Sequence, residues 1–247
     1  MSKQVALITG GMGGLGTALC RRLHREGFLV ATTCSPSNGR RQAWLAAQRD
    51  EGVNVLVYEV DVADEAACGM VAQRLLAETG RIDVLVNNAG ITRDRSLRKM
   101  SPDDWQAVLR TNLDSVFHMT RQVIDSMIAR RWGRVINISS VNGQAGAFGQ
   151  ANYAAAKAGM HGFTKALALE VARHGVTVNT VSPGYLDTAM VAAVPEEVMK
   201  ERILPAIPVG RLGAPEEVAG LVAYLVSDQA GYVTGANIAI NGGQHMC

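Results

Sequence analysis

The residues best suited to chemistry lie between Ile138 and Lys157, and the central pair is Tyr153 and Lys157. An apolar, β-branched run at 134–138 predicts a buried strand, and alanine-rich sequence predicts a helix from about residue 152. Because Lys157 lies four positions after Tyr153, both side chains lie on one face of that helix. A nearby ammonium is expected to lower the pKa of a phenol, which brings the phenol closer to useful acid–base strength at neutral pH.

Ser140 adds a third polar group at the end of the predicted strand. Open α/β sheets bind their ligands beside the carboxyl ends of the strands. A Tyr-x-x-x-Lys pair alone arises by chance on many helices, where surface or packing roles explain it. The serine thirteen residues earlier makes chance a poor explanation, so the three residues together predict an acid–base site.

The elements that must position these residues follow from an alternation of apolar and amphipathic stretches. We predict strands at 5–9, 28–33, 53–60, 82–86, 134–138, 177–181 and 237–240. Helices are predicted at 14–25, 42–50, 65–78, 102–110, 115–129, from 152 onward, and 215–225. This order predicts the α/β class, with a doubly wound parallel sheet of about seven strands and helices on both faces. Without a linker or repeat, residues 1–247 are expected to form one domain.

Composition narrows the possible functions. A net charge of +2 without a dominant basic block gives little support for nucleic-acid binding, and 48% hydrophobic residues allow a sizeable core. The cysteines are scattered without C-x-x-C spacing, so we expect reduced thiols, no metal site and a cytoplasmic protein. The sequence shows no signal-peptide pattern and no apolar run long enough to span a bilayer, so no membrane partner is expected.

The connection after the first predicted strand is glycine-rich and reads Thr9-Gly10-Gly11-Met12-Gly13-Gly14-Leu15-Gly16. Glycines permit a tight turn and close backbone approach, and the start of a helix offers amide groups to a pyrophosphate. Ordinary turn chemistry would also use glycines, but the strand–loop–helix context favours a dinucleotide site.

Together these motifs resemble the short-chain dehydrogenase/reductase family, from the first strand to the last residues. The resemblance implies a Rossmann fold and a catalytic set of Asn112, Ser140, Tyr153 and Lys157. In this set Asn112 would help to hold a water that links Lys157 to solvent. The resemblance also implies cofactor contacts from Gly10, Met12, Gly13, Gly14, Leu15, Gly16, Asp61, Val62, Asn88, Ala89, Gly90, Tyr153, Lys157, Pro183, Gly184, Leu186 and Thr188.

The end of the second predicted strand bears on the choice of nicotinamide cofactor. NAD enzymes place a carboxylate there to bind the ribose 2′-hydroxyl, and residues 31–36 contain none. Arg40 and Arg41 follow, and a guanidinium suits a 2′-phosphate. A solvated helix start is the other explanation for these arginines. We predict NADPH/NADP+ as the cofactor, with Arg40 as the favoured contact and Arg41 as the alternative.

Within the family, the resemblance is greatest to the acetoacetyl-CoA reductases of polyhydroxybutyrate synthesis. It rests on the glycine-rich loop at 10–14, on residues 90–94, 139–144, 148–150 and 241–246, and on Tyr185. It implies an acyl-CoA substrate, reduction of acetoacetyl-CoA to (R)-3-hydroxybutyryl-CoA, and a mobile substrate lid around 187–210. The expected substrate contacts are Asp94, Ser140, Ala147, Phe148, Gly149, Gln150, Tyr153 and Tyr185, although packing alone would also explain Phe148 and Tyr185.

Two other functions stay open at this point. A 3-oxoacyl-(acyl-carrier-protein) reductase of fatty acid synthesis shares nearly every motif, and it would need a basic patch for its acidic partner. Candidates for that patch are Arg130, Arg131, Arg173 and His174. A non-catalytic NADP-binding regulator is a remote alternative, because such proteins commonly lose the tyrosine or the lysine. The family resemblance also implies a homotetramer, with apolar surface from Met160, Phe163, Leu167 and Leu169.

Overall fold

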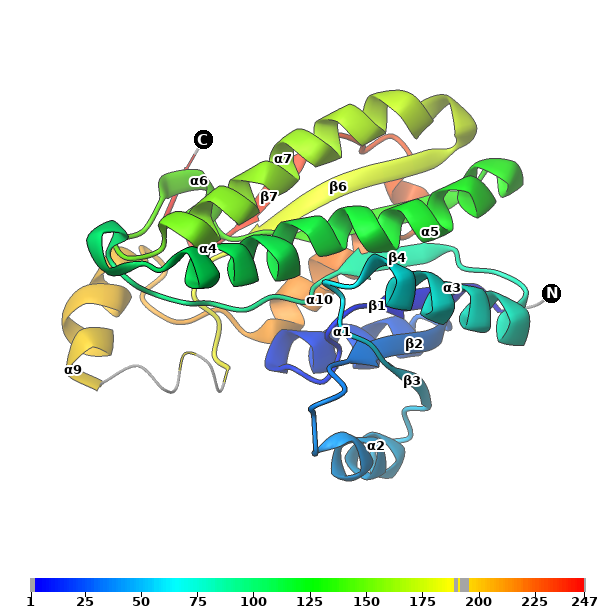
Figure 1. The fold of residues 1–247 in the computed structure, drawn as a ribbon, viewed down its shortest axis with the longest axis horizontal. Helices are drawn as coiled ribbons and strands as arrows, with labels where there is room; N and C mark the ends of the chain where they lie inside the picture. Colours follow the sequence, from blue (N-terminus) through cyan, green and yellow to red (C-terminus); the bar gives the residue numbers. More distant parts are fainter. Residues whose placement is uncertain (1–2, 189–190, 192–195, 247) are drawn as a thin grey trace.

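The computed structural model describes residues 3–188, 191 and 196–246, and it is built on one parallel sheet (Figure 1). The seven strands lie in the order β3-β2-β1-β4-β5-β6-β7. They are β1 (Val5–Ile8), β2 (Leu29–Cys34), β3 (Val55–Glu59), β4 (Val84–Asn87), β5 (Gly133–Ile138), β6 (Val176–Pro183) and β7 (Asn237–Ile240). The predicted doubly wound sheet is confirmed, and the predicted strand ends differ from the observed ends by two residues at most.

Helices cover both faces of the sheet, as Figure 1 shows. They are α1 (Gly14–Arg25), α2 (Arg41–Asp50), α3 (Glu65–Thr79), α4 (Pro102–Leu109), α5 (Ser115–Arg130), α6 (Val141–Ala145), α7 (Ala151–Val171), α9 (Glu196–Val198) and α10 (Pro215–Leu225). One face is covered by α3, α5 and α7, and the other by α1 and α10. Within the described ranges, none of the helices combines the length and apolar character that crossing a bilayer requires.

The central strands show why this sequence forms two cores. In β1, Val5 and Leu7 pack into the core under α3, α5 and α7, whereas Ala6 and Ile8 pack into the core under α1 and α10. Successive side chains of a strand point to opposite faces, so a strand covered on both sides needs a continuous apolar run. All four residues of β1 are therefore buried.

Two helical segments near the site were not predicted. The helices expected at 102–110 and 115–129 are joined by a π-helical turn, Arg110–Asp114, so that α4 and α5 form one interrupted helix. A short helix, α6, follows β5 directly and begins at the Ser140 cap. The π-helical turn is tied to a distant segment through Asn112 and Ile91, whereas α6 is capped locally by Ser140. Of the predicted lid at 187–210, residues 189–190 and 192–195 lie outside the described residues, and 196–206 form short helical turns.

The strand order reverses between β1 and β4, and this reversal locates the site. In open parallel sheets a crevice forms beside the carboxyl ends of the strands at the point of reversal. The predicted site residues of the loops after β1, β4, β5 and β6 all follow the carboxyl ends of their strands. The fold therefore gathers these loops at one edge of the sheet.

At the opposite edge of the sheet, where the strands begin, a buried carboxylate connects β1 to the start of β4. Asp83, just before β4, is 0% exposed. Its carboxylate accepts hydrogen bonds from Val5 N at 2.8 Å and from the Arg81 guanidinium at 2.7 and 2.8 Å. A buried charge is tolerated only when it is paired and hydrogen-bonded, so this cluster is expected to stabilise the β1–β4 pairing.

We expect Asp83→Ala to lower the free energy of unfolding by about 3 kcal/mol, because it removes the buried acceptor that binds the Val5 amide and pairs with the Arg81 cation. Urea unfolding at one protein concentration measures this change. The matched control is Glu26→Ala, which breaks the exposed Arg22–Glu26 ion pair and should cost about 1 kcal/mol or less. Equal losses in the two variants would contradict the importance of the Asp83 cluster.

Candidate active site

Tyr153 and Lys157 lie together at the start of α7. The Lys157 ammonium is 5.6 Å from the centre of the Tyr153 ring. Lys157 is 3% exposed, and its Nζ donates a hydrogen bond to Ile138 O, at the end of β5, at 2.7 Å. Tyr153 is half-buried. The structure thus brings the predicted pair to the carboxyl end of the central strand, one helical turn apart.

Burial dominates the acid–base properties of this pair. It lowers the pKa of Lys157 from 10.5 to about 7, because an ammonium loses its hydration inside the protein. Burial also raises the pKa of Tyr153; a hydrogen bond with Ser140 lowers it, and the Asp94 carboxylate raises it. The predicted lowering of the Tyr153 pKa by Lys157 is not found, since burial works in the opposite direction and leaves the phenol protonated at neutral pH.

The two serines after β5 have different tasks. Ser140 caps α6, and its Oγ accepts a hydrogen bond from Asn142 N at 3.1 Å. Because this bond uses a lone pair, the Ser140 hydroxyl proton stays available for donation. Ser139 Oγ donates to Lys157 O at 2.9 Å. Ser139 therefore holds α7 on the end of β5, while Ser140 presents a donor beside Tyr153.

Asn112 lies in the π-helical turn and is 0% exposed. Its Oδ1 accepts from Ile91 N at 2.8 Å, and its Nδ2 donates to Ile91 O at 2.9 Å. A Cβ added to Gly90 would lie 3.4 Å from Asn112 Oδ1 and 3.6 Å from Lys157 Nζ. Asn112, Gly90 and Lys157 therefore meet at one point, and the Asn112 side chain holds the loop after β4 there.

Two of the predicted cofactor loops are joined by hydrogen bonds. Thr9 Oγ1 accepts from Asn88 N at 2.9 Å and from Ala89 N at 3.0 Å. Asn88 Nδ2 donates in turn to Thr9 O at 2.9 Å and to Gly10 O at 3.2 Å. Gly10 has a φ of +67°, and a Cβ there would lie 2.9 Å from Ala89 Cα. Only glycine fits this crossing of the two loops.

The start of α1 fits a dinucleotide pyrophosphate. Gly13 at the N-cap forms no side-chain cap, and the first turn carries no acidic residue. Its amide groups are therefore open to an anion. Gly13 and Gly14 are exposed, and a Cβ on Gly14 would lie 2.8 Å from Thr188 Cγ2. Thr188, after β6, thus packs directly against the glycine-rich loop.

The remaining predicted cofactor residues lie at the same edge of the sheet. Met12 and Leu15 are half-buried in the glycine-rich segment, and Gly16 packs against Gly10 O. After β3, Asp61 is exposed and Val62 is buried.

The segment after β6 is tied to the rest of this edge. Pro183 ends β6, and Gly184 packs against the backbone of Asn241. Leu186 forms a bridge with Gly213, which joins the two ends of the lid segment.

A chain of polar side chains joins the segments that follow β4 and β5. Asn142 Nδ2 donates to Gln150 Oε1 at 2.9 Å, and Gln150 Nε2 donates to Asp94 Oδ2 at 2.8 Å. Arg95 N donates to Gly149 O at 2.8 Å. Of the other predicted substrate contacts, Ala147 is half-buried in the same loop, and Phe148 is 96% exposed.

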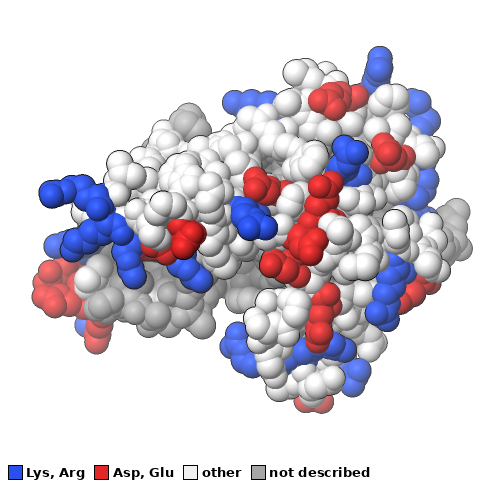
Figure 2. All heavy atoms as spheres, viewed as in Figure 1, with Lys and Arg blue, Asp and Glu red and all other residues white. Residues whose placement is uncertain are grey.

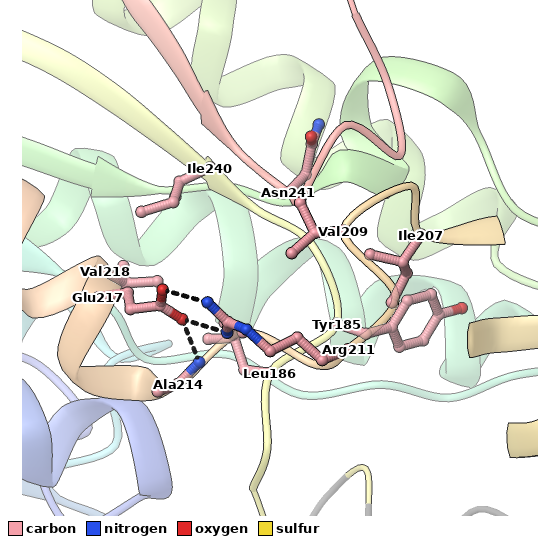
Figure 3. Close-up of a pocket in the computed structure, with 12 residues that line it drawn as sticks. Tyr185, Leu186, Ile207, Val209, Arg211, Ala214, Glu217, Val218, Ile240 and Asn241 are labelled. Carbon is pink, nitrogen blue, oxygen red and sulfur yellow. Dashed lines mark hydrogen bonds and ion pairs between the residues drawn. The ribbon is translucent and has the colours of Figure 1, made fainter. Parts of the chain in front are cut away.

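Tyr185 lies apart from this chain of side chains, in a small cavity of about 120 Å³ (Figure 3). Ile207, Val209 and Asn241 line the cavity with it. Beside them, Arg211 binds both oxygens of Glu217 at 2.8 Å and holds the pKa of that carboxyl at about 2. The structure does not bring Tyr185 into contact with Asp94 or Gln150.

Sequence reasoning missed several residues of this edge. Ser139, Asn142 and Asn152 were not given roles, because their hydrogen-bond partners lie on other segments, 18, 8 and up to 59 positions away. It also passed over the cations of 93–99, although their spacing in the sequence was a visible signal. These exposed side chains are Arg93, Arg95, Arg98 and Lys99.

Comparison with known proteins gives the family. A family model for short chain dehydrogenases matches residues 4–198. Acetoacetyl-CoA reductase from Cupriavidus necator is 53% identical over 246 residues, which cover 100% of each chain. Acetoacetyl-CoA reductase from Allochromatium vinosum is 50% identical over 98% of this chain and 99% of its own. The 3-oxoacyl-(acyl-carrier-protein) reductase from Escherichia coli is 43% identical over 98% of each chain.

The chain therefore belongs to the short-chain dehydrogenase family, as the resemblance predicted. It is an oxidoreductase, and the cofactor of this class is a nicotinamide dinucleotide. The exposed glycines and the uncapped start of α1 fit the phosphates of such a group.

The buried amine predicts how stability depends on pH. Between about pH 7 and pH 10.5 the unfolded chain keeps a proton on Lys157 that the folded protein has lost. The free energy of unfolding should therefore rise with pH across this window, by at most about 1.4 kcal/mol per pH unit. Lys157→Met removes this contribution, so the variant should be more stable than the wild type near pH 7 and lose that advantage towards pH 10.

Urea unfolding of the protein without added dinucleotide, at pH 7 and pH 9.5, measures this difference. Lys165→Met is the matched control, because Lys165 is exposed on the same helix. Wild-type pH dependence in Lys157→Met would contradict the lowered pKa.

Proposed function

We propose that this protein reduces acetoacetyl-CoA to (R)-3-hydroxybutyryl-CoA with NADPH. The observation that carries the proposal is that Tyr153, Lys157 and Ser140 lie together at the carboxyl end of β5. The relatives from Cupriavidus necator and Allochromatium vinosum are acetoacetyl-CoA reductases, which supports the choice of substrate.

The dinucleotide, when bound, supplies the hydride. The protein's own residues then have to orient the ketone and deliver a proton to its oxygen. In the proposed mechanism Tyr153 Oη–H donates this proton, and the Ser140 hydroxyl donates a hydrogen bond to the same oxygen. The Asn142 N–H that binds Ser140 Oγ favours this direction of donation. These donors act on charge that develops in the transition state, where such interactions have their largest effect.

The acid–base state of the site supports reduction. Burial and the Asp94 carboxylate raise the pKa of Tyr153, so the phenol carries the proton that reduction consumes. Lys157, with a pKa near 7, can gain or lose a proton at neutral pH. We infer that Lys157 exchanges protons with Tyr153. Asn112 then helps to hold a water through which the proton of Tyr153 is replaced.

The surroundings of the two arginines after β2 support NADPH as the cofactor. They favour Arg40 over Arg41 as the contact to its 2′-phosphate. Arg41 is committed to an ion pair with Glu59 at 2.6 Å. Arg40 is exposed and forms no ion pair within the part of the chain that the structure describes. No carboxylate ends β2, whose last residue is Cys34. A free guanidinium beside the adenosine end suits a 2′-phosphate.

We expect Arg40→Ala to lower the preference for NADPH over NADH by roughly tenfold, because it removes a charge-assisted contact worth about 1.4 kcal/mol. The ratio of kcat/KM for the two cofactors measures this preference. Arg41→Ala is the control and should shift the ratio less, since its charge is paired with Glu59. If only Arg41→Ala changes the ratio, the assignment belongs to Arg41.

The segment 93–99 supports the proposal that the substrate is a CoA thioester. Its four cations are exposed, and Arg95 N binds Gly149 O, next to the exposed Phe148. Figure 2 shows charges of both signs spread over the face in view rather than one dominant block. A local cluster of guanidinium and ammonium groups at the mouth of the site suits the phosphates of CoA.

The carrier-protein alternative is supported by the relative from Escherichia coli. Its expected basic patch lies elsewhere in the fold. Arg130 and Arg131 end α5, and Arg131 donates to Arg173 O, just after α7. Because α7 has 21 residues, its two ends are about 30 Å apart. Within one chain this patch is far from Tyr153.

The expected homotetramer remains a proposal. Leu169 is 86% exposed on α7, which suits a subunit contact. Met160, named with it, is 0% exposed and belongs to the core of the chain. Phe163 and Leu167 are half-buried. A CoA thioester and a nicotinamide dinucleotide are consistent with the expected cytoplasmic location.

One set of assays tests the proposed function. We expect kcat/KM with NADPH to be highest for acetoacetyl-CoA, lower for the same acyl group on a carrier protein, and lowest for a free ketoester. Tyr153→Phe is the control and should lose activity by at least roughly a thousandfold, while its affinity for NADPH stays within about threefold. Higher activity on the carrier-linked thioester would favour the alternative, and an active Tyr153→Phe would refute the mechanism.

A further inference from the structure

A buried side chain next to Tyr153 connects three segments of the site. Asn152 lies in the first turn of α7 and is 0% exposed. Its Nδ2 donates to Arg93 O, in the loop after β4, at 3.1 Å and to Asp104 O, in α4, at 3.2 Å. Its Oδ1 accepts from Tyr153 N at 2.8 Å. The amide thus uses both hydrogens and its oxygen on main-chain groups.

We propose that Asn152 is a positioning residue, which fixes the first turn of α7 so that the Tyr153 hydroxyl meets the substrate oxygen. The inference rests on the proposed role of Tyr153 as proton donor. Asn152 acts through its neighbour and through the two carbonyls that it binds, without touching substrate or cofactor.

The first turn of α7 needs such an anchor. The first amide groups of a helix have no partner within the helix, and Gln150, at the N-cap, forms no side-chain cap. Asn152 satisfies one of these groups, the N–H of Tyr153 itself. Because all three of its hydrogen bonds run in different directions, they fix the orientation of the amide plane and of the turn that carries it.

The two carbonyls belong to segments that carry other groups of the site. The loop with Arg93 O also carries Gly90, beside Lys157, and Asp94, which binds Gln150. The helix with Asp104 O continues through the π-helical turn to Asn112. Asn152 therefore sets Tyr153 relative to Asn112 and to the loop after β4. A simple core asparagine would have no such connections.

Asn179 offers a matched control. It is also 0% exposed, and it also binds main-chain groups with both ends of its amide: Val233 O at 2.7 Å and Ala236 N at 3.1 Å. These partners lie before β7, away from Tyr153. Replacing either asparagine by alanine should cost a similar amount of stability, because each replacement leaves buried main-chain groups unsatisfied. Only Asn152 should affect the position of the proton donor.

We expect Asn152→Ala to lower kcat for ketone reduction by on the order of 10²-fold, since a displacement of about 1 Å has an effect of this size. KM for the ketone and the dissociation constant of NADPH should change by no more than about threefold. Asn179→Ala should keep its kcat within about twofold at a similar loss of thermal stability. Steady-state kinetics measures kcat and KM, and NADPH fluorescence titration measures the dissociation constant, both at a temperature below the melting temperatures of the two variants. Thermal unfolding measures the loss of stability.

Asn152→Ser serves as the second variant, because its small hydroxyl preserves a polar partner in the turn but cannot reach both carbonyls. It should fold and show a kcat between those of the wild type and Asn152→Ala. Equal losses of kcat in Asn152→Ala and Asn179→Ala, or an unchanged kcat in Asn152→Ser, would overturn the inference. An inactive Tyr153→Phe beside a fully active Asn152→Ser would overturn this inference alone, whereas an active Tyr153→Phe would overturn the proposed mechanism.

Discussion

The site depends on the attachment of α7 to the end of β5. Lys157 Nζ donates to Ile138 O, and Ser139 Oγ donates to Lys157 O, so two hydrogen bonds run in opposite directions across the same junction. The first bond requires a buried amine, which is costly to ionise away from water. The bond places the amine over the face of the Tyr153 ring, 5.6 Å from the ring centre.

The sheet supports this junction through a row of buried polar side chains. Asn87 Nδ2 donates to Asn137 Oδ1 at 2.8 Å, Asn137 Nδ2 donates to Thr164 Oγ1 at 2.8 Å, and Thr164 Oγ1 lies 2.7 Å from Thr180 Oγ1. Asn87, Asn137 and Thr180 are register partners on β4, β5 and β6. A shift of one residue would turn these side chains to the other face, so the row fixes the register close to the points where the site loops begin.

Local sequence patterns predicted the sheet, its helices and the convergence of the site loops, because apolar periodicity and glycine-rich turns act over a few residues. The roles of Asn152 and Asp83 could not be read in this way. Asn152 binds a carbonyl 59 positions away, and Asp83 binds an amide 78 positions away. The π-helical turn around Asn112 was also missed, since its side chain is committed to Ile91, which lies on another segment.

The predicted direction of the Tyr153 pKa shift was wrong for a related reason. Spacing alone places an ammonium one turn from a phenol, but it does not reveal how much water reaches either group. In the fold Lys157 is buried and Tyr153 is half-buried, so desolvation lowers the pKa of Lys157 and raises that of Tyr153. A reductase has use for this outcome, because its tyrosine must hold a proton until the ketone oxygen becomes negative. Burial, rather than a neighbouring cation, then keeps Tyr153, the proposed proton donor, protonated.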